Sequence, residues 1–152
     1  MATLQSFRFD PPRSDDTVVV LSVSPLEETH SRLRGIFQRT NWEMIESQDC
    51  RDAMEVLRHN GLAVVVCERE LPDGTWLDLL NLAEGLTSPP LIIVTALDAD
   101  ERLWGEVLNL GGYDVLPKPL DTFEVTRVIS LAWQHWRQKW PAATRPSHAA
   151  VA

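Results

Sequence analysis

The chain has 152 residues, and its 14 Lys and Arg residues against 22 Asp and Glu give a net charge of −8. This length suits a single domain with a sizeable hydrophobic core. The negative charge argues against binding to nucleic acid or to an anionic membrane, because phosphate groups would be repelled and no basic patch interrupts the acidic surface. The sequence has no apolar stretch that could span a bilayer and no secretory signal over residues 1–16, so we expect a cytoplasmic location.

Strand-type and helix-type patterns alternate along the chain. Apolar or β-branched runs predict strands at 17–23, 42–45, 63–67, 90–95 and 114–116. Apolar residues at helical spacing predict helices at 26–39, 50–59, 76–86, 100–110 and 122–140. This order indicates βαβ units, and therefore an α/β fold of (βα)5 type, a doubly wound parallel five-stranded sheet.

One domain is expected over residues 17–140, with an N-terminal extension at 1–16 and a disordered tail at 141–152. Thr75 and Asp121 are predicted helix caps, and the Gly111-Gly112 pair is predicted to end a helix.

The cysteines and histidines do not have the spacing of a metal site. Cys50 and Cys67 are expected to be reduced and structural. The four histidines are scattered singly, and His30 is expected to be a solvated helix residue.

Polar residues follow the predicted strands at one edge of the sheet. The buried run at 63–67 ends in an acid, Glu68, and the carboxyl ends of parallel strands are where ligands bind in such folds. The residues expected at this edge are Ser22, Ser24, Glu68, Thr95 and Lys118. An acid, hydroxyl groups and an ammonium from separate strands would form a small site for an oxyanion.

Three motifs, in this order and spacing, give the sequence a family resemblance. They are Leu71-Pro72-Asp73-Gly74, Val94-Thr95-Ala96 and the segment from Gly111 to Pro119. Over residues 17–137 the chain resembles the receiver domain of bacterial response regulators, whose fold is CheY-like. In that family an Asp at the end of the third strand accepts a phosphoryl group, and two acids after the first strand hold Mg²⁺ beside it.

This sequence departs from the family pattern where the chemistry occurs. Glu68 stands at the phosphoacceptor position, and Ser22 and Val23 replace the acidic pair. Mg²⁺ binding is therefore expected to be weak or absent, because the ion prefers carboxylate and water oxygens. Without the ion, charge on a transferring phosphoryl group would not be offset, so we expect no phosphorylation, no turnover and no cofactor.

At other positions of the family pattern, this sequence keeps some residues and departs at others. The resemblance makes Thr95 and Lys118 pocket residues, and in the family these bind phosphoryl oxygens. Pro119 follows Lys118, and an X-Pro bond has an appreciable chance of being cis. Val115 occupies the position where many receivers carry an aromatic switch residue.

Two interpretations of Glu68 remain open. Its carboxylate could pair with Lys118 and imitate a phosphorylated site, or the pair could simply stabilise a degenerate pocket. The leading function is a stand-alone pseudo-receiver in signal transduction that acts by protein–protein interaction. The alternatives are a phosphoryl-accepting receiver of a two-component phosphorelay and a flavodoxin-like cofactor binder.

Four tryptophans are candidates for an interface. Trp133, Trp136 and Trp140 have helical spacing near the end of the last helix, where core packing is the default for the first two. Trp104 lies on the helix at 100–110. If these side chains are exposed, they suit a signalling partner, such as a histidine kinase or an output protein, or a homodimer through the fourth helix, fifth strand and fifth helix.

Overall fold

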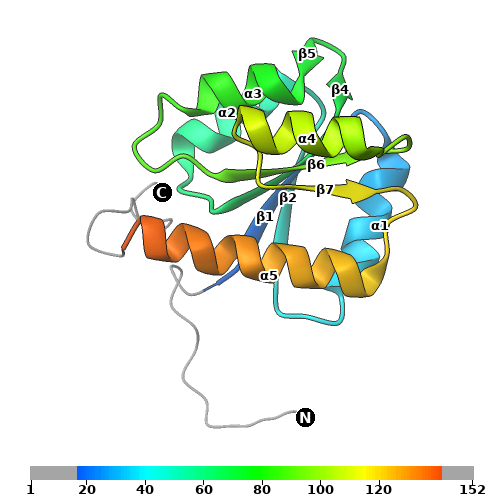
Figure 1. The fold of residues 1–152 in the computed structure, drawn as a ribbon. Coiled ribbons are helices and arrows are strands. Elements are labelled where there is room, and N and C mark those ends of the chain that lie inside the picture. Colours follow the sequence, from blue (N-terminus) through cyan, green and yellow to red (C-terminus); the bar gives the residue numbers. More distant parts are fainter. Residues whose placement is uncertain (1–16, 142–152) are drawn as a thin grey trace, which may run out of the picture.

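The computed structural model describes residues 17–141, and a five-stranded parallel sheet forms its centre (Figure 1). The expected N-terminal extension lies outside the described residues, and so does the expected tail beyond residue 141. The strands of the sheet are β1 (Val19–Val23), β2 (Glu43–Ser47), β3 (Val64–Glu68), β6 (Leu91–Ala96) and β7 (Asp114–Pro117). Their order is β2-β1-β3-β6-β7, with every neighbouring pair parallel.

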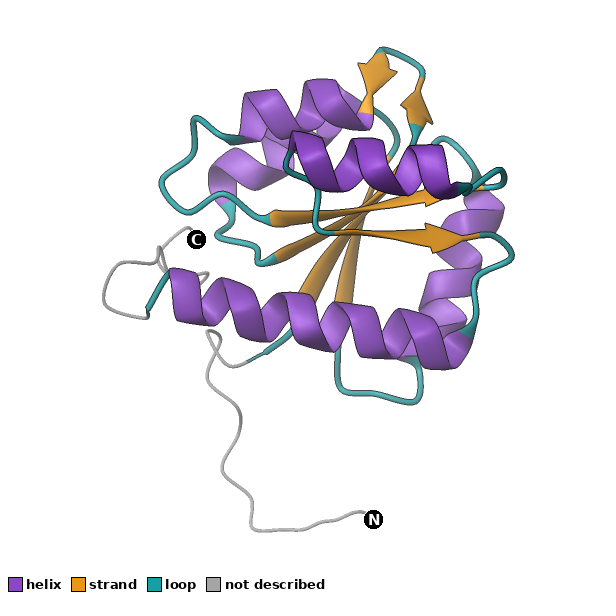
Figure 2. Cartoon of the chain, viewed as in Figure 1, coloured by secondary structure: helices purple, strands orange, loops and turns teal. Residues whose placement is uncertain are grey.

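Five helices cover the two faces of the sheet, as the (βα)5 prediction requires. They are α1 (Glu27–Phe37), α2 (Cys50–His59), α3 (Trp76–Ala83), α4 (Glu101–Leu110) and α5 (Thr122–Lys139). Figure 2 shows α2, α3 and α4 on one face and α1 and α5 on the other. The first four residues of β3, at 64–67, alternate between the two hydrophobic cores, and all four are buried.

The helix ends follow the predicted capping residues. Asp121 accepts a hydrogen bond from the Glu124 amide, and Thr75 and Asp78 form a reciprocal capping box. Gly111 ends α4 in the left-handed conformation, with φ 110°. The helix predicted at 50–59 has those bounds in the structure, whereas the other elements differ by a few residues at their ends.

A short hairpin after β3 was not predicted. It consists of β4 (Glu70–Leu71) and β5 (Gly74–Thr75), and Asp73 lies at its turn. The Asp73 carboxylate accepts hydrogen bonds from the amides of Cys50 and Arg51, at 2.9 and 3.0 Å. These amides belong to the first turn of α2, where backbone donors lack partners within the helix. The hairpin is thereby fixed to the start of α2.

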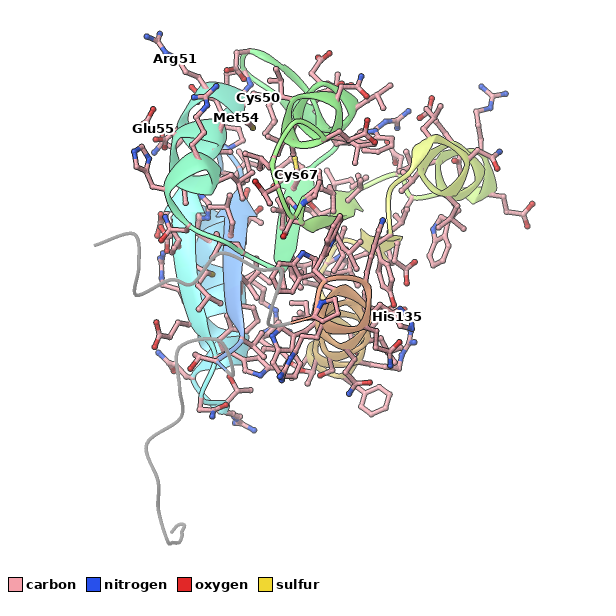
Figure 3. The ribbon with its side chains drawn as sticks, turned by 90° about the vertical axis from the view of Figure 1, so that its left-hand side faces the viewer. Cys50, Arg51, Met54, Glu55, Cys67 and His135 are labelled. Carbon is pink, nitrogen blue, oxygen red and sulfur yellow. The ribbon has the colours of Figure 1, made fainter. Side chains whose placement is uncertain are left out.

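Both cysteines are free and buried, as expected for structural thiols (Figure 3). Cys50 begins α2, and Cys67 lies in β3. Burial raises the pKa of Cys50 to about 11, with the nearby acids Asp73, Asp78 and Asp49 adding to the shift. Between residues 17 and 141, no helix combines the length and apolar character needed to cross a membrane.

Candidate functional site at the carboxyl edge of the sheet

Glu68 lies at the end of β3, and side chains from four other parts of the chain converge on it. Ser24 follows β1, Thr29 is in the first turns of α1, Thr95 is in β6, and Lys118 follows β7. The parallel strands bring these positions to one edge of the sheet, because right-handed crossovers return each strand in the same direction. Thr95 is the direct register partner of Glu68 across the β3–β6 pair.

Each carboxylate oxygen of Glu68 accepts hydrogen bonds. Oε2 lies 2.7 Å from each of three donors, Lys118 Nζ, Ser24 Oγ and Thr29 Oγ1. Oε1 accepts from Thr95 Oγ1 at 3.1 Å. Lys118 also donates to Thr29 Oγ1 at 3.0 Å, so its ammonium group contacts both Glu68 and Thr29. The predicted pairing of Glu68 with Lys118 is therefore present.

These contacts keep the carboxylate ionised although it is buried. Burial acts to raise the pKa of Glu68, but hydrogen bonds from Lys118, Ser24 and Thr29 and the charge of Lys118 outweigh it. The net effect is a pKa below the ordinary value. The side chains of Lys118 and Glu68 are 14% and 9% exposed, so this ion pair is largely shielded from solvent.

The expectation that Ser22 and Val23 belong to the pocket needs correction. The Ser22 hydroxyl contacts His30 Nδ1 at 2.8 Å, and Val23 is buried in the core that faces α2, α3 and α4. Ser24 and Thr29 take the places beside Glu68 instead. Sequence reasoning placed Ser24 at this edge but assigned it to a turn, a role it also has because its Oγ accepts from the Leu26 amide.

His30 is buried, and the prediction of a solvated residue is wrong. Only 3% of the residue is exposed, and Nε2 lies 2.9 Å from the Ser24 carbonyl oxygen. Its neighbour Thr29 was not predicted as a site residue at all. Both residues share the buried face of α1 with Leu33, Ile36 and Phe37, and two polar residues on that helical stripe were the available signal.

The structure also shows where Val115, at the switch position of the family pattern, and Pro119 lie. Val115 is fully buried in the core, in register with Val94 of β6. The Lys118-Pro119 peptide bond is cis. Pro119 lines a groove of about 350 Å³ between α1 and the segment after β7, with Leu26 and Leu97 among the other lining residues.

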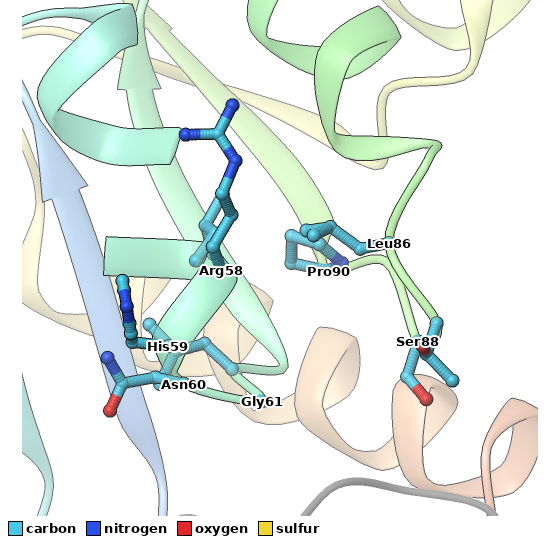
Figure 4. Close-up of a pocket in the computed structure, with 10 residues that line it drawn as sticks. Arg58, His59, Asn60, Gly61, Leu86, Ser88 and Pro90 are labelled. Atoms are coloured by element: carbon cyan, nitrogen blue, oxygen red, sulfur yellow. The ribbon is translucent and has the colours of Figure 1, made fainter. Parts of the chain in front are cut away.

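A hollow of about 290 Å³ lies beside the site, on the side of Arg69, Glu70 and Asp98. A further hollow, of about 150 Å³, lies at the opposite, amino edge of the sheet (Figure 4). Its walls come from the end of α2 and from the loop between α3 and β6. It is remote from Glu68, because Leu62 and Pro90 in its lining precede β3 and β6.

The side chains that donate to Glu68 include no second carboxylate. Apart from Glu68 itself, the cluster supplies hydroxyl groups and an ammonium, and Mg²⁺ sites usually contain further carboxylates and waters. Among residues 17–141, no group of three His, Cys, Asp or Glu side chains could hold a metal ion.

The tryptophans divide between core and partly exposed positions. Trp136 is 3% exposed and its indole N–H donates to the Pro89 carbonyl at 3.0 Å, so it is a core residue and not an interface candidate. Trp133 and Trp140 pack at the margin of the core under α5. Trp104 packs at the margin of the other core. These three remain partly exposed.

No family model matches the sequence, and neither does any curated protein. Solved structures do resemble this one. A signal receiver domain of an HD domain-containing protein from Pseudomonas fluorescens has a TM-score of 0.74 at 21% identity, covering 87% of this chain and 96% of that one. The beryllofluoride-activated NtrC4 receiver domain dimer has a TM-score of 0.71 at 19% identity, covering 78% and 98%.

A third similar structure is the receiver domain of a Saccharomyces cerevisiae response regulator in complex with a histidine phosphotransfer protein. Its TM-score is 0.71 at 14% identity, with 83% of this chain and 94% of that chain covered. The chain therefore has the CheY-like fold of response regulator receiver domains, as its sequence motifs predicted.

Proposed function

We propose that this chain is a cytoplasmic receiver-like signalling module held in one state by the Glu68–Lys118 pair. In this proposal it acts by binding other proteins, without being phosphorylated. The observation that carries the proposal is the set of contacts at the phosphoacceptor position. The Glu68 carboxylate already accepts from Lys118 and Thr95, the two residues that the family resemblance assigns to a phosphoryl group.

The same contacts argue against a working phosphoacceptor. A carboxylate that attacks phosphorus must be free to approach it in line, and Oε2 of Glu68 is held by three donors at 2.7 Å. Ser22 and Val23, which stand where the family has acids, turn toward His30 and into the core. Charge on an incoming phosphoryl group would then be balanced by Lys118 alone, which is too little for chemistry that depends on electrostatic stabilisation.

A flavodoxin-like cofactor site gains no support from the segment after β1. A phosphate there would need free backbone amides at the start of α1. The Leu26 amide instead donates to Ser24 Oγ at 2.9 Å, and residue 25 is a proline, which has no amide hydrogen.

The direct test is mass spectrometry of the intact protein after incubation with acetyl phosphate and Mg²⁺. A phosphorylatable receiver domain in the same tube serves as the positive control. We expect the control to gain a phosphoryl group and this protein to keep its mass. A modified protein whose phosphoryl group maps to Glu68 would overturn the proposal and make the chain a phosphorelay component.

The surface formed by α4, β7 and α5 is the proposed partner face (Figure 1). Large apolar side chains that are exposed on its two helices are Leu108, Leu110, Phe123 and Leu131. Trp104 is partly exposed on α4 one turn before Leu108, so both side chains lie on one side of the helix. Exposed apolar surface of this kind favours association with a signalling protein, such as a histidine kinase or output protein, or with a second copy of the chain.

A further inference from the structure

Most of the buried polar side chains belong to a single network around Glu68. Eight polar or charged residues are buried within residues 17–141, and all except Ser47 and Ser88 belong to it. Ser24, Thr29 and Thr95 contact the Glu68 carboxylate directly. The members that do not contact it, Ser22 and His30, contact each other at 2.8 Å. His30 connects this outer pair to the site through Ser24.

Every polar group of Ser24 has a hydrogen-bond partner. It is fully buried, its amide donates to the Ser47 carbonyl at 2.9 Å, and its Oγ accepts from the Leu26 amide at 2.9 Å. The Oγ hydrogen goes to Glu68 Oε2, at 2.7 Å. The remaining group, the carbonyl oxygen, accepts from His30 Nε2 at 2.9 Å. His30 therefore contacts the backbone of the residue whose hydroxyl donates to Glu68.

The partners of His30 assign its tautomer. A carbonyl oxygen can only accept, so Nε2 must carry a hydrogen to bond with Ser24. In the neutral imidazole Nδ1 is then the acceptor, and the Ser22 hydroxyl donates to it. Ser22 and His30 are thus joined by a hydrogen bond, and His30 is joined to the backbone of Ser24, the residue whose side chain donates to Glu68.

We propose that His30 is a positioning residue, which anchors the Ser24 carbonyl and so keeps the Ser24 hydroxyl on Glu68. This inference rests on the proposed function and identifies a residue that helps to hold Glu68 in its pair with Lys118. In receiver domains, as the sequence resemblance implies, the positions of Ser22 and Val23 supply acids for a divalent cation. Here the Ser22 hydroxyl contacts His30 Nδ1 instead, at 2.8 Å.

Removing the donor of His30 would leave the buried Ser24 carbonyl without a partner. An unsatisfied buried carbonyl is unfavourable, so the segment after β1 would turn to reach water. The hydroxyl would then leave Glu68, and the carboxylate would lose one of the hydrogen bonds that favour its ionised form. The expected signature is a rise in the titration midpoint of Glu68.

The experiment is a ¹³C NMR titration of the Glu68 carboxyl in wild type, His30→Phe and His30→Gln proteins. Phenylalanine fills the space of the imidazole but has no donor, whereas the glutamine amide can donate from near the Nε2 position. We expect His30→Phe to move the midpoint up toward the ordinary value of about 4.3, and His30→Gln to keep the wild-type midpoint. Ile36→Val, a buried change on the same helix, controls for packing and should leave the midpoint unchanged.

Two results would overturn the proposal. One is a wild-type midpoint in His30→Phe, and the other is an equal shift in the phenylalanine and glutamine variants, which would indicate a packing role. Should the phenylalanine variant fail to fold, ¹⁵N NMR of the wild-type imidazole decides the question. A hydrogen on Nε2 at neutral pH supports the bond to the Ser24 carbonyl, and a hydrogen on Nδ1 alone excludes it. Neither measurement involves a partner or phosphate, so failure here is distinguishable from failure of the proposed function.

Discussion

Lys118 and Glu68 form an ion pair across an intervening strand. Glu68 ends β3 and Lys118 follows β7, and these strands are separated in the sheet by β6. The 2.7 Å contact therefore spans β6. Thr95 of β6 itself donates to the other carboxylate oxygen of Glu68. The pair links the centre of the sheet to its β7 edge, and β7 is part of the face that we propose for partners.

Replacing Lys118 by methionine should destabilise the fold strongly. The substitution keeps most of the side-chain volume but leaves the Glu68 charge buried and unpaired, a change that costs about 3 kcal/mol. Urea unfolding at neutral pH measures the loss. The double variant Lys118→Met, Glu68→Gln should be less destabilised than Lys118→Met alone, because no uncompensated charge remains. Equal losses in the two proteins would mean that the uncompensated charge of Glu68 is not what destabilises Lys118→Met.

Stability should fall in acid because of Glu68. Its pKa is lowered in the folded state, so it stabilises the fold fully at pH values above the unfolded-state pKa, about 4.3. That contribution disappears as the pH drops through the folded-state pKa. Urea unfolding of wild type and Glu68→Gln across this range should show curves that converge on acidification. Parallel curves would exclude a lowered Glu68 pKa.

Asp73 should stabilise the start of α2 from outside the helix. It accepts from the amides of Cys50 and Arg51, and these bonds hold its pKa below the usual range despite the opposing effect of burial. Asp73→Ala should cost about 1 kcal/mol, the usual value for a lost N-terminal cap. Glu70→Ala, an exposed change on the same hairpin, serves as the control and should stay within about 0.5 kcal/mol of wild type. Equal unfolding midpoints for the two variants would contradict this role.

The sequence predicted the layout of the fold better than the composition of the site. Helical spacing and caps located α2 and the start of α5, because those signals are local. The hairpin was missed, since two-residue strands have no periodicity to detect. The contact of Thr29 with Glu68 spans 39 positions in the chain and depends on how α1 packs against β3, which no local pattern specifies.

The same limit explains the error at His30. Polar residues near the start of a helix are usually solvated, and its burial depends on the Ser22 and Ser24 partners that β1 supplies. Glu68, Thr95 and Lys118 were predicted together because strand ends in a parallel sheet meet at one edge.

Leu108 and Leu82 offer a matched test of the proposed partner face. Both are leucines with 52% exposure, but Leu108 lies on α4 one turn from Trp104, whereas Leu82 lies on α3, outside the face formed by α4, β7 and α5. Sedimentation velocity over a range of concentrations measures self-association. We expect a concentration-dependent dimer in wild type and Leu82→Glu, and a monomer in Leu108→Glu, because a charge in the centre of an apolar interface loses its solvation. A wild-type protein that stays monomeric throughout would exclude the homodimer, and loss of the dimer in Leu82→Glu alone would place the interface on α3.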